Sequence, residues 1–227
     1  GSGTVSSANV QNNQSITLGS IAIADGSGGG LASNYNLTTG TFDISQKWVS
    51  VGGQKIYDAT TTVSSSDLEV TGEVTGESIS ITGTGSVTDK NVGSGKTIDI
   101  SGLSLSDGSH SASNYTIGTT SFAITRRNLS ISGEKVYDGT GTVLASQIDT
   151  VNTAGGETLT ISGEGSVSLP SVGTNKSITL NTLGISDGTN GTIGLASNYT
   201  LDSGSFDITT KPITLSGSRQ YDGTTDV

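Results

Sequence analysis

The stretch Lys135-Val136-Tyr137-Asp138-Gly139-Thr140 occurs three times in this chain. The other copies are Lys55-Ile56-Tyr57-Asp58-Ala59-Thr60 and Arg219-Gln220-Tyr221-Asp222-Gly223-Thr224. The three tyrosines lie 80 and then 84 residues apart, and the sequence between them repeats at the same period. A fixed period of this kind indicates an array of like modules, each stacked on its neighbours.

The period divides the chain into four parts. They are the C-terminal half of a repeat at 1–46, complete repeats at 47–126 and 127–210, and the start of a further repeat at 211–227. A module of this length is near the size at which a single core is marginal. Because no flexible Gly/Ser linker separates the repeats, we expect little swing between modules and an extended array.

Short segments in which apolar residues alternate with Ser and Thr fill each repeat, with turn residues between them. This pattern predicts an all-β protein, a tandem array of Ig-like β-sandwich modules of roughly 80 residues with about six to eight strands each. The alternative is a β-grasp-like module with one short helix at 64–75 and 144–155. The sequence pattern does not decide between these two folds.

Two local features predict how the strands are connected. The segments 35–44, 115–124 and 199–208 alternate on both sides of a Gly-containing turn, which predicts three β-hairpins. The segments 15–23, 97–105 and 177–185 shift their apolar phase by one residue, which predicts a β-bulge or a tight bend.

The repeated Tyr-Asp-Gly-Thr stretch is the most site-like feature, and its structural interpretation is a turn. The Asp side chain would accept a hydrogen bond from the backbone N–H two residues on, while the Tyr ring packs and its hydroxyl finds a partner. Ala59 stands where the other copies have glycine. Since alanine is costly at positive φ, it favours a type I turn over types I′ and II′. The candidate structural residues of this motif are Tyr57, Asp58, Thr60, Tyr137, Asp138, Thr140, Tyr221, Asp222 and Thr224.

A second motif, Ala-Ser-Asn-Tyr, also occurs three times, and its candidate residues are Asn34, Tyr35, Asn114, Tyr115, Asn198 and Tyr199. An Asp-Gly pair precedes each copy, and the loop between the pair and the motif differs in length from copy to copy. This variation in length predicts that the loop is exposed. Carboxylates in such loops suit Ca²⁺, with Asp25, Asp107 and Asp187 as the candidates. Each loop offers only one carboxylate, however, and no EF-hand pattern is present, so we expect no cofactor, with calcium as the minor alternative.

The composition excludes several classes of function. The chain has no Cys, no Met and one His, and its formal net charge is −10. Nucleic acid is an unfavourable partner for a chain this acidic, because phosphate neutralisation needs clustered Lys and Arg. No apolar run is long enough to insert in a membrane, and we find no signal peptide at the start. No catalytic motif is present, so we expect that this is not an enzyme.

Three phased copies of Lys-x-Tyr-Asp-Gly-Thr, with Ala59 in place of Gly in the first and Arg219 in place of Lys in the third, resemble the YDG-type repeats of large bacterial surface proteins. A distant Ser-Asn-Tyr follows each of the first two copies. Those proteins are giant secreted fibrillar or filamentous-haemagglutinin-like adhesins. The resemblance implies an extracellular stalk at the bacterial cell surface that projects an adhesive tip in attachment or biofilm formation. Its partners would be neighbouring repeats of the same chain, and no active site is implied.

The alternative function is a ligand-binding module for carbohydrate or host protein. It would use the variable Gly-rich loops, and its partners would be host or biofilm surface ligands. Sugar-binding surfaces usually expose aromatic rings, and Trp48 is the one free candidate that the sequence offers.

Overall fold

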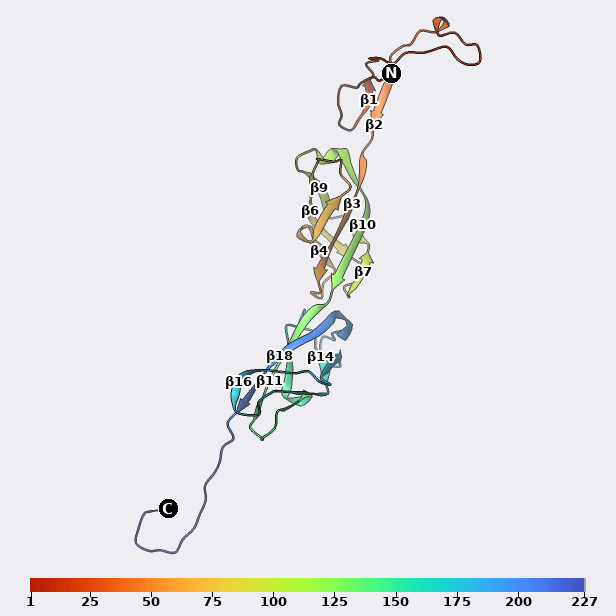
Figure 1. Cartoon of the computed structure of the whole chain (residues 1–227). Helices are drawn as coiled ribbons and strands as arrows, with labels where there is room; N and C mark the ends of the chain where they lie inside the picture. The colour runs from red at the N-terminus through yellow and green to blue at the C-terminus, as the bar shows by residue number, and fades with distance from the viewer. Residues whose placement is uncertain (227) are drawn as a thin grey trace. The chain divides into compact units, whose positions relative to one another are not determined.

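The computed structural model describes residues 1–226, and of residue 203 the backbone alone. The chain forms two compact units (Figure 1). The first contains Gly1–Lys55 and Thr61–Ile124, and the second contains Ile56–Thr60 and the chain from Thr125 on. Most of the first copy of the Tyr-Asp-Gly-Thr stretch therefore belongs to the second unit, although it lies in the first complete repeat of the sequence.

In its described part, which ends at residue 226, the second unit has eight strands and two single-turn 3₁₀ helices. They are β11 (Arg127–Val136), β12 (Thr142–Leu144), η4 (Ala145–Gln147), β13 (Ile148–Val151), β14 (Leu159–Ser162), β15 (Glu164–Ser166), β16 (Gly173–Ser177), β17 (Gly184–Asp187), η5 (Ala196–Asn198) and β18 (Tyr199–Thr209).

A four-stranded sheet with the order β13-β11-β18-β16 organises this unit. The first and last strands, β11 and β18, lie side by side and parallel, in a register that runs from Arg127 opposite Tyr199 to Val136 opposite Thr209 (Figure 1). The outer strands β13 and β16 pair antiparallel with β11 and β18. Two small antiparallel sheets, β12-β15 and β14-β17, complete the unit.

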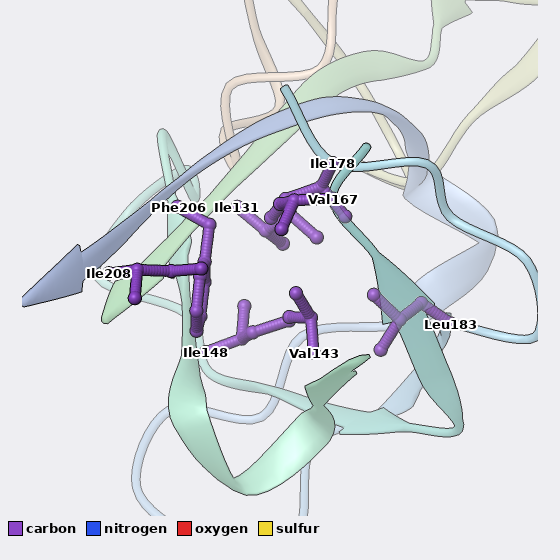
Figure 2. Packing of buried hydrophobic residues seen from close by; sticks show 8 residues of the cluster. All are labelled: Ile131, Val143, Ile148, Val167, Ile178, Leu183, Phe206 and Ile208. Carbon is purple, nitrogen blue, oxygen red and sulfur yellow. The ribbon is translucent and has the colours of Figure 1, made fainter. Parts of the chain in front are cut away.

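The core of the second unit lies against one face of the four-stranded sheet. Leu129, Ile131 and Lys135 alternate with more exposed residues along β11, as period two requires. Figure 2 shows how eight apolar side chains converge, five from the strands β11, β12, β13 and β18 and three from the segments that adjoin β15, β16 and β17. They are Ile131, Val143, Ile148, Val167, Ile178, Leu183, Phe206 and Ile208.

The first unit contains the half repeat and the first complete repeat. The half repeat contributes β1 (Gln11–Ser15), η1 (Ala32–Asn34) and β2 (Thr41–Ile44). The complete repeat contributes β3 (Lys47–Ile56), β4 (Thr62–Ser64), η2 (Ser65–Asp67), β5 (Leu68–Thr71), β6 (Ile79–Val87), β7 (Gly93–Lys96), β8 (Ile98–Asp99), β9 (Leu103–Asp107), η3 (Ala112–Asn114) and β10 (Tyr115–Thr125). Its four-stranded sheet has the order β5-β3-β10-β7, which matches the order in the second unit.

The three predicted hairpins are wrong. The segments at 115–124 and 199–208 each lie within one continuous strand, β10 and β18, and residues 35–40 form no strand. Gly204 does not turn the chain; a Cβ at this residue would come within 2.4 Å of the Ile131 side chain on β11. A glycine in a strand that allows another chain segment to approach closely looks, in sequence, like a hairpin turn.

The predicted tight bend is confirmed. The Leu103 amide bonds the Ile100 carbonyl, and the Leu183 amide bonds the Leu180 carbonyl, with N···O distances of 2.9 and 2.7 Å. In the first unit the bend separates β8 from β9, which pair with different ends of β6. The one-residue shift of apolar phase therefore marks the point where the chain turns between two strands.

The all-β class with several sheets is confirmed. The central sheet is mixed, unlike the antiparallel sheets of an Ig-like sandwich, and it places the first and last strands parallel at its centre, as in a β-grasp. In place of the short helix of that alternative are the single turns η2 and η4. Among the described residues, no helix is long and apolar enough to cross a membrane.

Candidate functional site: a buried tyrosine and glutamate cluster

The Tyr-Asp-Gly-Thr stretch forms a turn closed by its aspartate. The amides of Thr60, Thr140 and Thr224 donate to the carboxylate two residues earlier, with N···O distances of 2.9, 2.9 and 3.0 Å. The threonine hydroxyls donate to the same Oδ1 atoms. The predicted hydrogen bond is thus present in all three copies, and the hydroxyl explains why threonine follows in each.

The basic residue of the stretch also takes part in the turn. Lys135 is almost fully buried, and its Nζ lies 3.1 Å from a carboxylate oxygen of Asp138 and 2.7 Å from the carbonyl oxygen of Thr142. Arg219 likewise donates to Asp222 at 3.1 Å. Lysine and arginine can replace each other here because either supplies a cation with several donors.

The interpretation of Ala59 from sequence is wrong. Ala59 has a φ of 65°, close to the values of 83° at Gly139 and 77° at Gly223. The turn therefore requires positive φ in every copy, and alanine adopts it at a cost of about 1–2 kcal/mol. Packing and the aspartate bonds hold the backbone in this conformation despite the side chain.

Ala59→Gly is expected to stabilise the second unit by about 0.5–1 kcal/mol, because the strain at positive φ exceeds the extra unfolded-state entropy of glycine. Gly139→Ala is the matched control, expected to destabilise by about 1 kcal/mol, since a Cβ there meets nothing within 4 Å and only the backbone conformation differs. Urea unfolding of both variants measures the two effects. A loss of stability in Ala59→Gly would contradict the strain argument.

Asp138 makes the turn sensitive to acid. The Thr140 amide, followed by Lys135 and the Thr140 hydroxyl, lowers the pKa of Asp138 to about 2. A depressed carboxyl pKa stabilises the fold fully above the unfolded pKa near 3.8 and loses that contribution as the pH falls toward 2. We expect the stability difference between the native chain and Asp138→Asn to shrink between pH 4 and pH 2 in thermal melts. A difference that stays constant over this range would rule out the linkage.

Tyr57 leaves its own repeat and enters a buried cluster in the second unit. Its hydroxyl donates to Glu157 Oε1 at 2.7 Å, and the Tyr199 hydroxyl donates to Glu157 Oε2 at 2.7 Å. The two tyrosine rings meet edge to face, with centroids 5.4 Å apart and planes at 79°. Tyr57 is 0% exposed and both Glu157 and Tyr199 are 3% exposed, so one carboxyl group holds two buried phenols.

The cluster is closed by backbone and neighbouring groups. The Ala154 amide donates to the Tyr199 hydroxyl at 3.1 Å, and the Tyr57 amide donates to the Thr125 carbonyl at 2.9 Å. Burial, and next the bond to Glu157, raises the pKa of the Tyr199 hydroxyl far above its usual value. The hydroxyl therefore remains a donor at ordinary pH, which suits a structural bond better than proton transfer.

The first unit repeats part of this arrangement. The Tyr115 hydroxyl donates to Glu77 Oε2 and accepts from the Val74 amide at 3.2 Å. The hydrogen bond to Glu77 raises the pKa of Tyr115. His110 Nε2 lies 3.9 Å from Glu77 Oε1. A hydrogen bond between a glutamate and a tyrosine of the same repeat is thus present in both complete repeats, as Glu77 with Tyr115 and Glu157 with Tyr199. In the second unit the glutamate also accepts from Tyr57, a tyrosine of the preceding repeat.

The other sequence-predicted tyrosines lie outside such clusters. Tyr35, Tyr137 and Tyr221 are 69%, 40% and 96% exposed. Asn198 is fully buried, Asn114 bonds Val10 and Asn9 of the half repeat, and Asn34 is exposed. The structure therefore joins Tyr57 with Asn198 and Tyr199 in one unit and leaves Tyr35, Tyr137 and Tyr221 at the surface.

Sequence reasoning missed the two glutamates. A signal for them exists: Glu77 and Glu157 each follow the tyrosine of their repeat, Tyr57 and Tyr137, by 20 residues. A charged residue that recurs at one register position beside an apolar strand is a candidate for a buried, paired group. Its partner could not be inferred, because Tyr57 reaches a glutamate 100 residues away.

The three calcium candidates hold the variable loops closed. Asp25, Asp107 and Asp187 accept, at 2.7 Å in each case, from the amide of the alanine in Ala-Ser-Asn-Tyr. The same bond closes loops of three different lengths, which explains how the loop can vary without moving the strands. In residues 1–226 no group of three or more His, Asp or Glu side chains is placed to hold a metal ion.

The model of the YDG domain matches the chain twice, over residues 46–122 and 125–206. The chain belongs to the YDG domain family. Each YDG domain match contains one Glu-Tyr pair, which is Glu77 with Tyr115 in the first and Glu157 with Tyr199 in the second. Tyr57 belongs to the first match in sequence but lies in the second unit of the structure. No curated protein matches the chain, and no solved structure does. The predicted boundaries 47–126 and 127–210 stay a prediction.

Proposed function

We propose that these YDG domains are extender repeats of a secreted bacterial cell-surface adhesin, which hold an adhesive tip away from the cell in attachment or biofilm formation. One observation carries the proposal: Tyr57 directly follows the first strand of one repeat and is completely buried beside Glu157 of the next. A repeat whose core needs a side chain from its neighbour suits an unbroken array. Its partners are then adjacent repeats, and its location is extracellular.

The charge and the exposed side chains support the same role. The net charge of −10 keeps a long array soluble and limits unspecific association with other acidic surfaces. Aspartate-closed loops and polar strand faces can vary without disturbing the cores. Such a chain needs no reactive group to fulfil a spacing role.

Surface display tests the proposal. One, two or four copies of the segment 47–210 are placed between a cell-surface anchor and a binding domain of known ligand, on bacteria with a polysaccharide coat. Capture of ligand-coated beads is expected to rise with the number of copies. Equal capture by all three, at equal expression, would contradict the spacing role.

A second candidate is carbohydrate or host-protein binding, favoured by Trp48. Its side chain is 74% exposed and lies over Gly118, where a Cβ would come within 3.3 Å of the indole ring. An exposed aromatic ring over a flat, polar sheet is a platform on which sugars can stack. A glycan array probed with the native chain and with Trp48→Ala tests it: a signal that disappears in the variant supports binding.

A further inference from the structure

A groove lies on the solvent-facing side of the central sheet in the first unit, and strands rather than the variable loops line it. Its volume is about 440 Å³, within the range of small-molecule sites. Among the residues that line it are, from β3, β5 and β10, Ser50, Gly52, Glu69, Thr71, Thr119 and Ser121. Of the lining residues that the structure describes, Glu69 alone carries a charge. The groove therefore offers a ligand several hydroxyl groups and one carboxylate.

Gly52 forms the floor of the groove. Val49 and Val51 of β3 are 2% and 1% exposed, so the alternate residues Ser50 and Gly52 face solvent. A Cβ at Gly52 would have only the Ser121 carbonyl oxygen within 4 Å, at 3.2 Å. Little protein covers this glycine, and the space that a side chain would occupy is left for a ligand.

Two hydroxyl groups meet in the groove. Ser50 Oγ on β3 and Thr119 Oγ1 on β10 are 2.7 Å apart. One of them donates to the other, so the pair keeps one hydrogen and further lone pairs for a ligand, because each hydroxyl has one donor and two acceptor positions. The exposed carboxylate of Glu69 accepts hydrogen bonds and donates none. Together these groups can both donate to and accept from the neighbouring hydroxyls of a sugar.

Trp48 adjoins the groove and supplies an apolar surface. It precedes Ser50 by two residues in β3 and therefore lies on the same side of the sheet. Its ring lies over Gly118, the residue before Thr119 of the groove. An indole ring has a flat apolar face on which the C–H groups of a pyranose can stack. From Trp48 to Gly52 the strand rises by roughly 13 Å, which is longer than one sugar ring.

The same side of the sheet in the second unit lacks both features. β11 pairs with β13 in the register in which β3 pairs with β5, so Ser132 stands at the position of Gly52 and Asn128 at that of Trp48. Asn128 is exposed, as Trp48 is, so this position faces solvent in either unit. The glycine floor and the ring are therefore particular to one repeat and are not required by the shared fold.

We propose that this groove binds a short oligosaccharide of neutral hexoses. One ring stacks on Trp48, and the hydroxyls of the next bond the Ser50 and Thr119 pair and donate to Glu69. The proposal rests on the second candidate function above, and it assigns the binding to a sheet face in place of the variable loops. Glycans that carry carboxylates are disfavoured, because Glu69 and the net charge of −10 repel them.

The first test uses the fluorescence of Trp48, which is the single tryptophan of the chain. The native chain is titrated with short oligosaccharides of glucose, galactose, mannose and N-acetylglucosamine, and with oligogalacturonate as the acidic control. A saturable blue shift is expected with at least one neutral oligosaccharide and not with oligogalacturonate, because stacking removes water from the indole. No saturable change with any neutral oligosaccharide, or an equal response to the acidic one, overturns the proposal.

The second test separates the groove from the ring, by calorimetric titration with the oligosaccharide that responds in the first. Gly52→Ser gives the first unit the residue of the second, so the fold is kept, and it should weaken binding at least about tenfold because the side chain fills the floor. Glu69→Gln should weaken it about fivefold, since a charge-assisted acceptor is lost. Ser132→Ala, on the same side of the sheet in the second unit, is the control and should leave binding unchanged.

The outcomes distinguish the groove from the candidate function on which it rests. Binding that Trp48→Ala abolishes but that Gly52→Ser and Glu69→Gln leave at the native level overturns the groove and keeps carbohydrate binding by the ring. A native chain that binds no glycan overturns both.

Discussion

Tyr57→Ala is expected to lower the unfolding free energy of the second unit by about 3–5 kcal/mol, the range for removing a large buried aromatic side chain. The ring is 0% exposed and packs edge to face on Tyr199. Its removal leaves a cavity and takes one of two hydroxyl donors from Glu157. The change lies in the first complete repeat, yet the loss is expected in the fold of the second.

Tyr137→Ala is the matched control, because it changes the same residue of the same motif one repeat later. Tyr137 is 40% exposed, so we expect a loss of about 1 kcal/mol or less. Hydrogen exchange followed by mass spectrometry, on peptides from 127–209 and from 61–124, reports each unit separately. Equal effects of the two substitutions would show that burial of Tyr57 is not what stabilises the second unit.

Tyr57→Phe separates the ring from the hydroxyl. It keeps the packing and the edge-to-face contact but removes the bond to Glu157, so we expect a loss of about 1–2 kcal/mol. A loss as large as that of Tyr57→Ala would assign the whole effect to the hydrogen bond.

The second large effect is expected from Glu157→Ala, which removes the acceptor of two buried phenols at once. Each buried hydroxyl left without its acceptor costs about 1–3 kcal/mol, so the expected loss is about 2–5 kcal/mol in the second unit. Glu157→Gln retains one acceptor oxygen, and we expect an intermediate loss of about 1–2 kcal/mol.

Glu77→Ala is the control for this prediction. The Glu77 side chain is 23% exposed and accepts from Tyr115, so water can replace the lost bond and the expected loss is about 1 kcal/mol. Urea unfolding combined with the same hydrogen-exchange peptides measures both changes. If Glu77→Ala lowered stability as much as Glu157→Ala, the large effect of Glu157→Ala could not be assigned to its second buried tyrosine, Tyr57.

Local patterns predicted what depends on neighbours in the chain. Period-two alternation identified most strands, and the phase shift near Leu103 and Leu183 identified the tight bends. The hydrogen bond from each threonine amide to the aspartate two residues earlier also follows from adjacent residues. Two predictions failed because the local pattern fits more than one structure. A glycine such as Gly204 occurs both in hairpin turns and where strands approach closely, and an alanine such as Ala59 normally excludes the positive φ that this turn nevertheless adopts.

The amino-acid sequence alone therefore determined the all-β class, the repeat and the chemistry of the aspartate turn, because each arises from residues a few positions apart. Tertiary structure decided the parallel pairing of β11 with β18, the positive φ of Ala59 and the partner of Tyr57. Those features depend on contacts across roughly a whole repeat or more. A side chain's periodicity shows that it is buried, but only the folded chain determines which distant group it is buried against.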